Sequence, residues 1–201
     1  MIRSRLRGAT IVGAIAAVGL VGCAQADAAP RVVDPSGFSA AGPWAGEFAE
    51  SAADTSPYQR QILSDGTISA REVADAQSRM SACMRDLGYD YTTAEDGTSE
   101  ASPLPGRKAE DATAMNDSKS KCAKDFDSDV TYLFNEVRRN PEKQDEATIT
   151  VACLRAARLV DDTYTERDWR GQNDDGNFSF SPWDPAAVQC RLDPLGLWRQ
   201  Q

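Results

Sequence analysis

Residues 69–88 read SAREVADAQSRMSACMRDLG and form the clearest helical pattern of the chain. Ser69 and Glu72 make a capping box, in which each side chain accepts a hydrogen bond from the backbone N–H of the other residue. Gly88 is a residue type that commonly follows the C-terminus of a helix. Between these signals apolar residues recur at helical spacing, at Val73, Ala76, Met80, Cys83, Met84 and Leu87. The stretch therefore predicts an amphipathic helix that carries Cys83 on its apolar face.

A faint internal repeat extends this pattern. Ala82–Arg85 (ACMR) recurs as Ala152–Arg155 (ACLR), each copy is followed by Tyr-Thr, and another cysteine comes 39 or 37 positions after the repeated one. Four cysteines allow three disulfide connectivities, and the repeat favours Cys83–Cys122 with Cys153–Cys190. Chance similarity over four residues would leave the other pairings open. On the chain-entropy model each bridge, closing a loop of about 40 residues, would stabilise the fold by roughly 4 kcal/mol.

The remaining chain from residue 43 onward also predicts helices. They begin at proline-containing starts near residues 43, 56 and 184, or follow apolar residues at helical spacing over 130–137 and 149–160. Tyr89–Thr93 is the only segment typical of a strand, and the polar stretch Glu95–Lys108 predicts a loop. We therefore expect residues 43–201 to form a mostly α, loop-rich domain of about five or six helices, stapled by two disulfides.

The N-terminus has the features of an export signal. Met1–Gly8 contains three arginines, and the next fourteen residues, 9–22, carry no charge. This run is shorter than the roughly 20 apolar residues that span a bilayer, and with its basic flank it is typical of a secretory signal. The run ends in Leu20-Val21-Gly22-Cys23, which resembles the lipobox of bacterial lipoproteins.

This resemblance implies an anchored protein. In that family the sulfur of the residue at Cys23 receives a diacylglyceryl group and a peptidase cuts before it, so residues 1–22 would be a signal peptide. Residues 23–42 are mostly small or polar, which predicts a flexible tether. Because two acyl chains give lasting attachment, we expect the domain to sit at the cell membrane, facing outside the cytoplasm. A plain secretory signal cut at Ala24-Gln25-Ala26 is the alternative.

The layout of the whole chain is also similar to that of uncharacterised secreted lipoproteins of high-GC Gram-positive bacteria. The similarity rests on the lipobox, the two helical cysteines, the segment Leu63-x-Asp65-Gly66-x-Ile68-Ser69-x-x-Glu72 and the segment Cys190-x-x-Asp193-Pro194-Leu195. It implies a cellular address and a shape, and it brings no known activity with it.

Charge and cysteine usage exclude several classes of function. The net charge is −9, and because 1–22 holds three of the 22 basic residues and no acid, the mature chain has 19 basic against 31 acidic residues, a net −12. Nucleic-acid binding needs clustered Lys and Arg, so we expect no nucleic-acid partner. Export places the four remaining cysteines in an oxidising compartment. The chain has no histidine and no Cys-x-x-Cys pair, which argues against a zinc site and against thiol catalysis. No cofactor is expected.

One loop weakly resembles a calcium site. Asp65, Gly66 and Glu72 stand where the second half of an EF-hand loop has its ligand, its glycine and its last carboxylate. Leu63, however, would occupy a position that requires an oxygen ligand. A helix–turn–helix joint, with a glycine after the first helix and a capping box on the second, explains the same residues without a metal. The acidic turn 173–177 is open to the same two interpretations. Its side chains offer oxygen atoms of the kind that calcium prefers, and its residues are also common turn formers.

Tryptophans are the candidate ligand-binding residues. Trp169, Trp183 and Trp198 lie in the loop-rich C-terminal third, and Trp44 is a further aromatic side chain near the start of the domain. Such rings would form a surface for a sugar or an apolar partner, or they would pack in the core or at its rim.

Carboxylates offer the alternative of hydrolysis. Glycosidases use two of them, and the nominal pairs here are Asp86 with Asp90 and Asp161 with Asp162, along with Asp168. No nucleophile-elbow or nucleotide-binding motif accompanies them. We therefore expect a non-catalytic binding or interaction module of the cell envelope, whose partner is the membrane through Cys23 and an envelope protein or small ligand. The alternative is a carboxylate-dependent hydrolase acting on envelope polymer.

Overall fold

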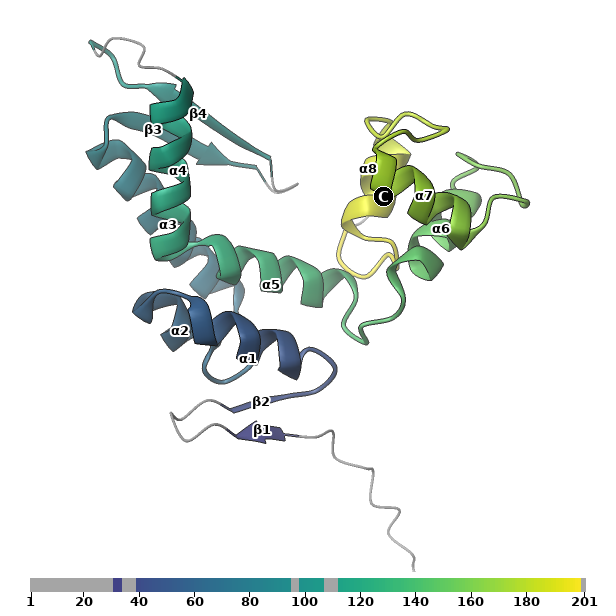
Figure 1. Ribbon diagram of the computed structural model, residues 1–201, viewed down its shortest axis with the longest axis horizontal. Coiled ribbons are helices and arrows are strands. Elements are labelled where there is room, and N and C mark those ends of the chain that lie inside the picture. Colours follow the sequence, from purple (N-terminus) through teal and green to yellow (C-terminus); the bar gives the residue numbers. More distant parts are fainter. Residues whose placement is uncertain (1–30, 34–38, 95–97, 107–111, 200–201) are drawn as a thin grey trace, which may run out of the picture.

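The computed structural model describes residues 31–33, 39–94, 98–106 and 112–199. Over these ranges the chain is mostly α-helical, as predicted, with eight helices and two small antiparallel sheets (Figure 1). The helices are α1 (Ala45–Asp54), α2 (Pro57–Leu63), α3 (Ala70–Asp86), α4 (Ala112–Phe126), α5 (Ser128–Arg139), α6 (Glu146–Ala156), α7 (Glu166–Asp175) and α8 (Pro185–Leu192). The strands are β1 (Arg31–Val33), β2 (Ser39–Ala41), β3 (Tyr89–Thr93) and β4 (Ser99–Pro103). The predicted signal peptide, Cys23 and most of the predicted tether lie outside the described residues.

The elements form a base and two arms (Figure 1). The base comprises β2, α1, α2, the first half of α3 and α5. The first arm comprises the second half of α3, the β3–β4 hairpin and α4. The second arm comprises α6, α7, α8 and their loops, residues 145–199. In Figure 1 the arms rise on the same side of α5, and α1 and α2 lie on its other side.

The base holds the largest apolar core, to which four helices and β2 contribute. Its fully or almost fully buried side chains include Phe48, Leu63, Ala76, Val130 and Leu133. The predicted capping box at Ser69 and Glu72 is present at the start of α3. Helices α4 and α5 meet over the buried amide of Gln59, which donates to the carbonyl of Lys124 at 2.8 Å and accepts from the N–H of Asp129 at 2.9 Å.

The folded part of the chain begins before residue 43. Ala40 in β2 is fully buried in the base core, and the N–H of Ser39 donates to the carbonyl of Ser64 at 2.7 Å. Gly66 has a φ of +73°, and a Cβ at this position would lie 2.5 Å from Ala40, so glycine is required where β2 crosses the turn. Residues 39–42 thus belong to the fold and not to the expected tether. Their small and polar composition is typical of a tether, but the small side chain of Ala40 is what allows β2 to approach Gly66 closely.

The first arm contains the first of the two predicted disulfides. Cys83 on α3 is bonded to Cys122 on α4, with their Cα atoms 5.8 Å apart. Strand β3, which the sequence predicted, alternates buried and exposed residues and buries Tyr89 and Tyr91. It pairs with β4, which lies in the stretch Glu95–Lys108 that we expected to be a loop. That prediction was wrong for 99–103, since the polar strand β4 is held by pairing with β3 and needs no apolar pattern of its own.

The second arm contains the other predicted disulfide, Cys153–Cys190, which joins α6 to α8 with Cα atoms 5.6 Å apart. Its core is small, and its buried residues are Val151, Leu154, Tyr164 and Cys190. Helices α4 and α7 raise the number of helices above the five or six expected. Within the described residues α4 buries only Cys122 and α7 buries none, so neither carries the apolar stripe by which a helix is recognised in a sequence.

None of the described helices is both long enough and apolar enough to cross a membrane.

Candidate functional site

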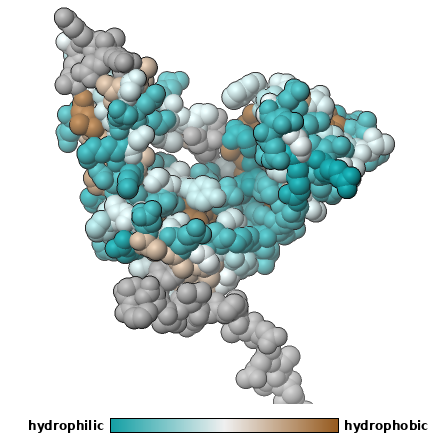
Figure 2. Space-filling view, viewed as in Figure 1, coloured by the Kyte–Doolittle hydropathy of each residue, from teal (hydrophilic) through white to brown (hydrophobic). Residues whose placement is uncertain are grey.

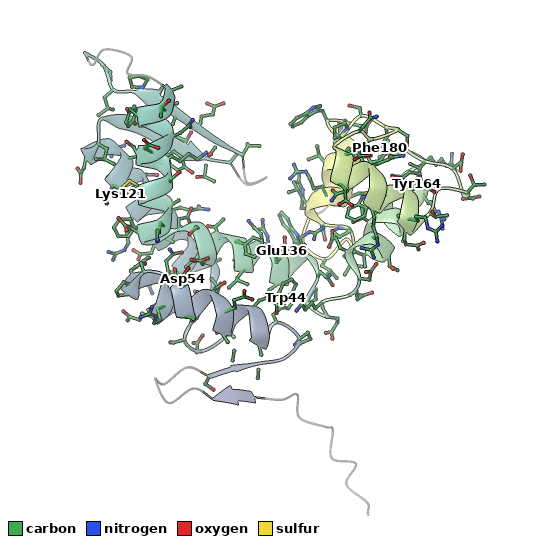
Figure 3. All side chains as sticks on the ribbon, viewed as in Figure 1. Trp44, Asp54, Lys121, Glu136, Tyr164 and Phe180 are labelled. Atoms are coloured by element: carbon green, nitrogen blue, oxygen red, sulfur yellow. A yellow bond between two sulfur atoms is a disulfide. The ribbon has the colours of Figure 1, made fainter. Side chains whose placement is uncertain are left out.

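A cleft of about 780 Å³ lies between the two arms, above α5. Figure 2 shows the molecule hollowed between the arms, and Figure 3 places Glu136 on the α5 floor of this hollow. The base lines the cleft mainly through α5, and the second arm lines it through α6, α7, α8 and the C-terminal segment. The first arm contributes Thr98. Its aromatic residues are Trp44, Tyr132, Trp169 and Trp198, and its charged residues are Glu136, Arg138, Arg139, Lys143, Glu146 and Arg191.

The lining of the cleft is positively charged although the protein is acidic. Four cations face two carboxylates in the lining, whereas the whole chain has a net charge of −9. A concave wall of one sign focuses the electrostatic potential and raises the local concentration of ions of the opposite sign. The lining of the cleft is therefore suited to an anion.

Arg139 occupies the junction between the base and the second arm. Its guanidinium donates to both carboxylate oxygens of Glu146, at 2.6 and 2.7 Å, and to the carbonyl of Arg191 at 3.1 Å. It also lies 3.5 Å from the carboxylate of Glu136, whose pKa is raised by burial although Arg139 opposes the rise. Because Arg139 is itself buried, this fork of hydrogen bonds connects α5 to α6 and α8 and fixes the cleft floor relative to the second arm.

Asp193 places Trp198 in the cleft. The Asp193 carboxylate is almost fully buried and accepts hydrogen bonds from the backbone N–H groups of Leu197, Trp198 and Arg199, at 2.7, 3.0 and 2.7 Å. Burial alone would raise the pKa of Asp193, but these three hydrogen bonds lower it below its ordinary value. The ring of Trp198 is in turn covered by the guanidinium of Arg138, 3.5 Å from the ring centroid, which is a cation–π contact.

Trp44 forms a wall of the cleft and not a stacking platform. Its side chain is 9% exposed, and its indole N–H donates to the carbonyl of Asn140 at 2.9 Å. The side-chain amide of Asn140 donates to the backbone C=O of Gln144 and accepts from its N–H. These two hydrogen bonds hold the connection between α5 and α6 in one conformation. The exposed side chain of Lys143 reaches back to Glu47 on α1. These contacts keep the base side of the cleft in place.

The structure brings together two of the three tryptophans that the sequence singled out. Trp169 and Trp198 line the cleft together with Trp44. Trp183 is absent from the lining and is 80% exposed on the loop before α8. The cleft cations and Tyr132 were missed by sequence reasoning. The only signal for them was the pair Arg138-Arg139 at the end of a helix in an acidic chain.

The other candidate residues have local structural roles. Asp65 accepts hydrogen bonds from the N–H and hydroxyl of Thr67, and Glu72 completes the capping box of α3. Over the described ranges, no three or more His, Cys, Asp or Glu residues are grouped so as to hold a metal ion.

The nominal hydrolase carboxylates lie outside the cleft. Asp161 accepts from the N–H of Thr163 at 2.8 Å, and Asp168 forms the capping box at the start of α7. Asp90 lies 3.7 Å from Arg85 in an exposed ion pair, and Asp86 and Asp162 are exposed. The structure therefore does not gather these side chains into one site.

Comparisons with protein-family models, with curated proteins and with solved structures found no match to this chain.

Proposed function

We propose that this chain is an exported lipoprotein, attached to the cell membrane through lipid on Cys23, which acts as a non-catalytic binding module of the envelope. Its ligand site is the cleft between the arms. The attachment is inferred from the lipobox sequence and the basic, uncharged run before it. The binding role is inferred from the structure of the described domain.

One observation carries the binding role. Four cations and four aromatic side chains line a single concave surface of an acidic protein. Ligand sites combine apolar and aromatic walls with a few polar groups that fix orientation, and this cleft has both. The volume of about 780 Å³ lies in the range of roughly 300–1,000 Å³ that is typical of small-molecule sites.

The contacts that the two acidic residues of the cleft make with Arg139 favour a binding role over hydrolysis. Glu146 gives both of its oxygens to Arg139, and Glu136 lies against the same guanidinium. A general acid or nucleophile has to present its carboxyl group to the substrate. The two cleft acids are instead used to fix Arg139, and the acid pairs that suggested a hydrolase have capping or surface positions.

The binding role is tested by a thermal-shift panel. Neutral sugars, organic amines, phosphate esters and carboxylates are added to the purified chain and to two variants. Asn135→Trp fills the cleft from α5, and Gln61→Trp adds the same ring at an exposed position of α2 outside the cleft. A ligand at a hundred times its dissociation constant stabilises the native state by about 2.7 kcal/mol.

For a domain of this size such stabilisation raises the melting temperature by about 5–10 °C. We expect at least one class to produce this shift in the parent and in Gln61→Trp, and a much smaller one in Asn135→Trp. An equal shift in all three proteins would exclude the cleft, and no shift from any class would contradict a small-ligand role.

The anchor is tested separately in cells. Metabolic labelling with a radioactive fatty acid is expected to label the parent chain and not Cys23→Ala, and an inhibitor of the lipoprotein peptidase is expected to accumulate precursor. Unlabelled parent protein with normal processing would show that the chain uses a plain secretory signal.

A further inference from the structure

A second, smaller hollow opens beside the cleft in the second arm. It has a volume of about 100 Å³, and five residues line both spaces: Arg139, Glu146, Trp169, Asn173 and Arg191. The two spaces are therefore neighbouring parts of one surface. A ligand that lies in the cleft at this end has direct access to the smaller pocket.

The part of the smaller pocket that the cleft does not share is mainly apolar. Beyond the shared residues its walls are mainly Leu154, Phe178, Phe180, Pro182 and Ala187. The rings of Phe178 and Phe180 lie 5.2 Å apart, and Leu154 is almost fully buried. A dry, engineered cavity of roughly 150 Å³ accommodates benzene. The pocket here therefore has room for one branched aliphatic group or part of a ring, and not for a chain of sugars.

Arg191 stands where the pocket meets the cleft. Its backbone is fixed by the last turn of α8 and by the hydrogen bond that its carbonyl accepts from Arg139. Its side chain is exposed, and it makes no hydrogen bond or ion pair with any described residue. Four of the five N–H groups of the Arg139 guanidinium, by contrast, are engaged by Glu146, Glu136 and the carbonyl of Arg191. Arg191 is thus the guanidinium that is available to a ligand at this place.

The anion that suits this position is a carboxylate. A guanidinium fork matches two carboxylate oxygens. At this end of the cleft Arg139 is engaged by Glu136 and Glu146, so the local charge left for a ligand is the single positive charge of Arg191; a carboxylate balances it, whereas a doubly charged phosphate monoester would leave one negative charge beside the two acids. An ammonium group on the neighbouring carbon would lie close to the Arg191 guanidinium that binds the carboxylate, and the two positive charges would repel each other. An amide at that carbon is neutral, and the exposed amide of Asn173, which also borders both spaces, has the donor and acceptor to bond to it.

We propose that the cleft and the adjoining pocket form one site for an N-acylated apolar amino acid, in which Arg191 binds the carboxylate and the pocket takes the side chain. This chemistry occurs at the C-terminus of a peptide and in free N-acyl amino acids. The proposal rests on the proposed binding role of the cleft and names its ligand class.

The test is isothermal titration of the purified chain with three matched probes. N-acetyl-L-leucine has both features, N-acetylglycine lacks the apolar side chain, and N-acetyl-L-leucinamide lacks the charge. We expect the first probe to bind at least tenfold more tightly than either of the others, because N-acetyl-L-leucinamide loses the charge-assisted hydrogen bonds to Arg191 and N-acetylglycine loses the burial of an apolar side chain in the pocket. A pentapeptide ending in leucine and its amidated form distinguish a peptide end from a free N-acyl amino acid.

Two exposed arginines supply the matched variants. Arg191→Gln is expected to weaken binding of N-acetyl-L-leucine by about tenfold or more, whereas Arg167→Gln, on α7 and outside both linings, is expected to leave it unchanged. Equal binding of the acid and its amide, tighter binding of phenyl phosphate, or full affinity in Arg191→Gln would each overturn the proposal. If another class from the panel binds in the cleft and N-acetyl-L-leucine does not, the binding role stands and only this ligand class is wrong.

Discussion

The two arms carry a similar short sequence on a helix, ACMR in one and ACLR in the other, and each arm is closed by a disulfide from that helix. They differ in the placement of their aromatic residues. The first arm buries Tyr89 and Tyr91 of its hairpin against helices α3 and α4, and of its described residues only Thr98 lines the cleft. The second arm leaves Trp169 partly exposed and supplies most of the pocket walls. The comparison indicates that the repeat closes both arms with a disulfide, and that recognition, on the binding role proposed above, would be concentrated in the second arm.

The largest expected difference comes from removing each disulfide. Replacing both Cys153 and Cys190 by serine is expected to cost about 4 kcal/mol of unfolding free energy on the chain-entropy model, and to unfold the second arm while the base stays folded, because that arm has so small a core. The same change at Cys83 and Cys122 is expected to cost a similar amount but to lower the stability of the base as well, because α3 belongs to both cores. Hydrogen exchange measured by mass spectrometry separates these outcomes. Uniform loss of protection in both variants would contradict the distinction between the arms.

A smaller effect is expected at the joint between the base and the second arm. Arg139→Met keeps the length of the side chain but leaves Glu146 without its partner. Removing one member of a buried pair costs roughly 3–5 kcal/mol. Because the Glu146 side chain is 38% exposed and regains water, we expect about 2–3 kcal/mol in chemical denaturation. The second change Glu146→Gln, added to Arg139→Met, should recover part of this loss. No recovery would show that the loss arises from the other contacts of Arg139, with Glu136 and the carbonyl of Arg191, and not from an unpaired Glu146.

A third prediction concerns the C-terminal segment of the second arm. Asp193→Asn keeps the shape but removes the charge that three N–H groups bind, and we expect a loss of about 1–2 kcal/mol at pH 7. The pKa of Asp193 is lower in the folded protein than its ordinary value, so its contribution is present above the ordinary aspartate range, near pH 3.9, and is lost as the pH falls through the folded pKa. Denaturation measured from pH 7 down to pH 3 should therefore show the difference between parent and variant shrinking at the acidic end. A constant difference would contradict this origin.

The smallest effect is expected at Trp183. Because it is 80% exposed and outside the cleft lining, Trp183→Ser should change stability by less than about 0.5 kcal/mol and leave binding of any cleft ligand unaltered. Trp169→Ser, on the wall shared by the two hollows, should weaken binding measurably in the same titration. Loss of binding in Trp183→Ser without loss in Trp169→Ser would place recognition on the exposed loop and not in the cleft.

The parts of the fold that the sequence predicted are those with a periodic signal. The apolar spacing from Val73 to Leu87 identified α3, and the repeat around Cys83 and Cys153 led to both disulfide pairings, which the structure has. Helices α4 and α7 were not expected, because they bury little apolar surface. Strand β4 was missed because its pairing partner, not its own composition, holds it in place.

The cleft was predictable only in fragments. Trp169 and Trp198 were selected as aromatic residues of a loop-rich region, but their neighbours in the cleft come from elements far apart along the chain, such as Trp44 before α1 and Arg138 at the end of α5. Arg191 has no local motif around it. Its position depends on the packing of α8 against α6, which the Cys153–Cys190 bridge fixes. Residues that meet only after folding leave no spacing pattern in a sequence.

The four tryptophans provide the most direct test of the claim that the cleft between the arms is the ligand site. Each indole N–H gives its own signal in a proton–nitrogen correlation spectrum, and the signals are assigned by single replacement. The chain is titrated with the panel compound that raises its melting temperature most. We predict that the signals of Trp169 and Trp198 shift and saturate together while that of Trp183 stays in place. A shift of Trp183 alone, or saturable binding that moves none of the three cleft tryptophans, would contradict the account.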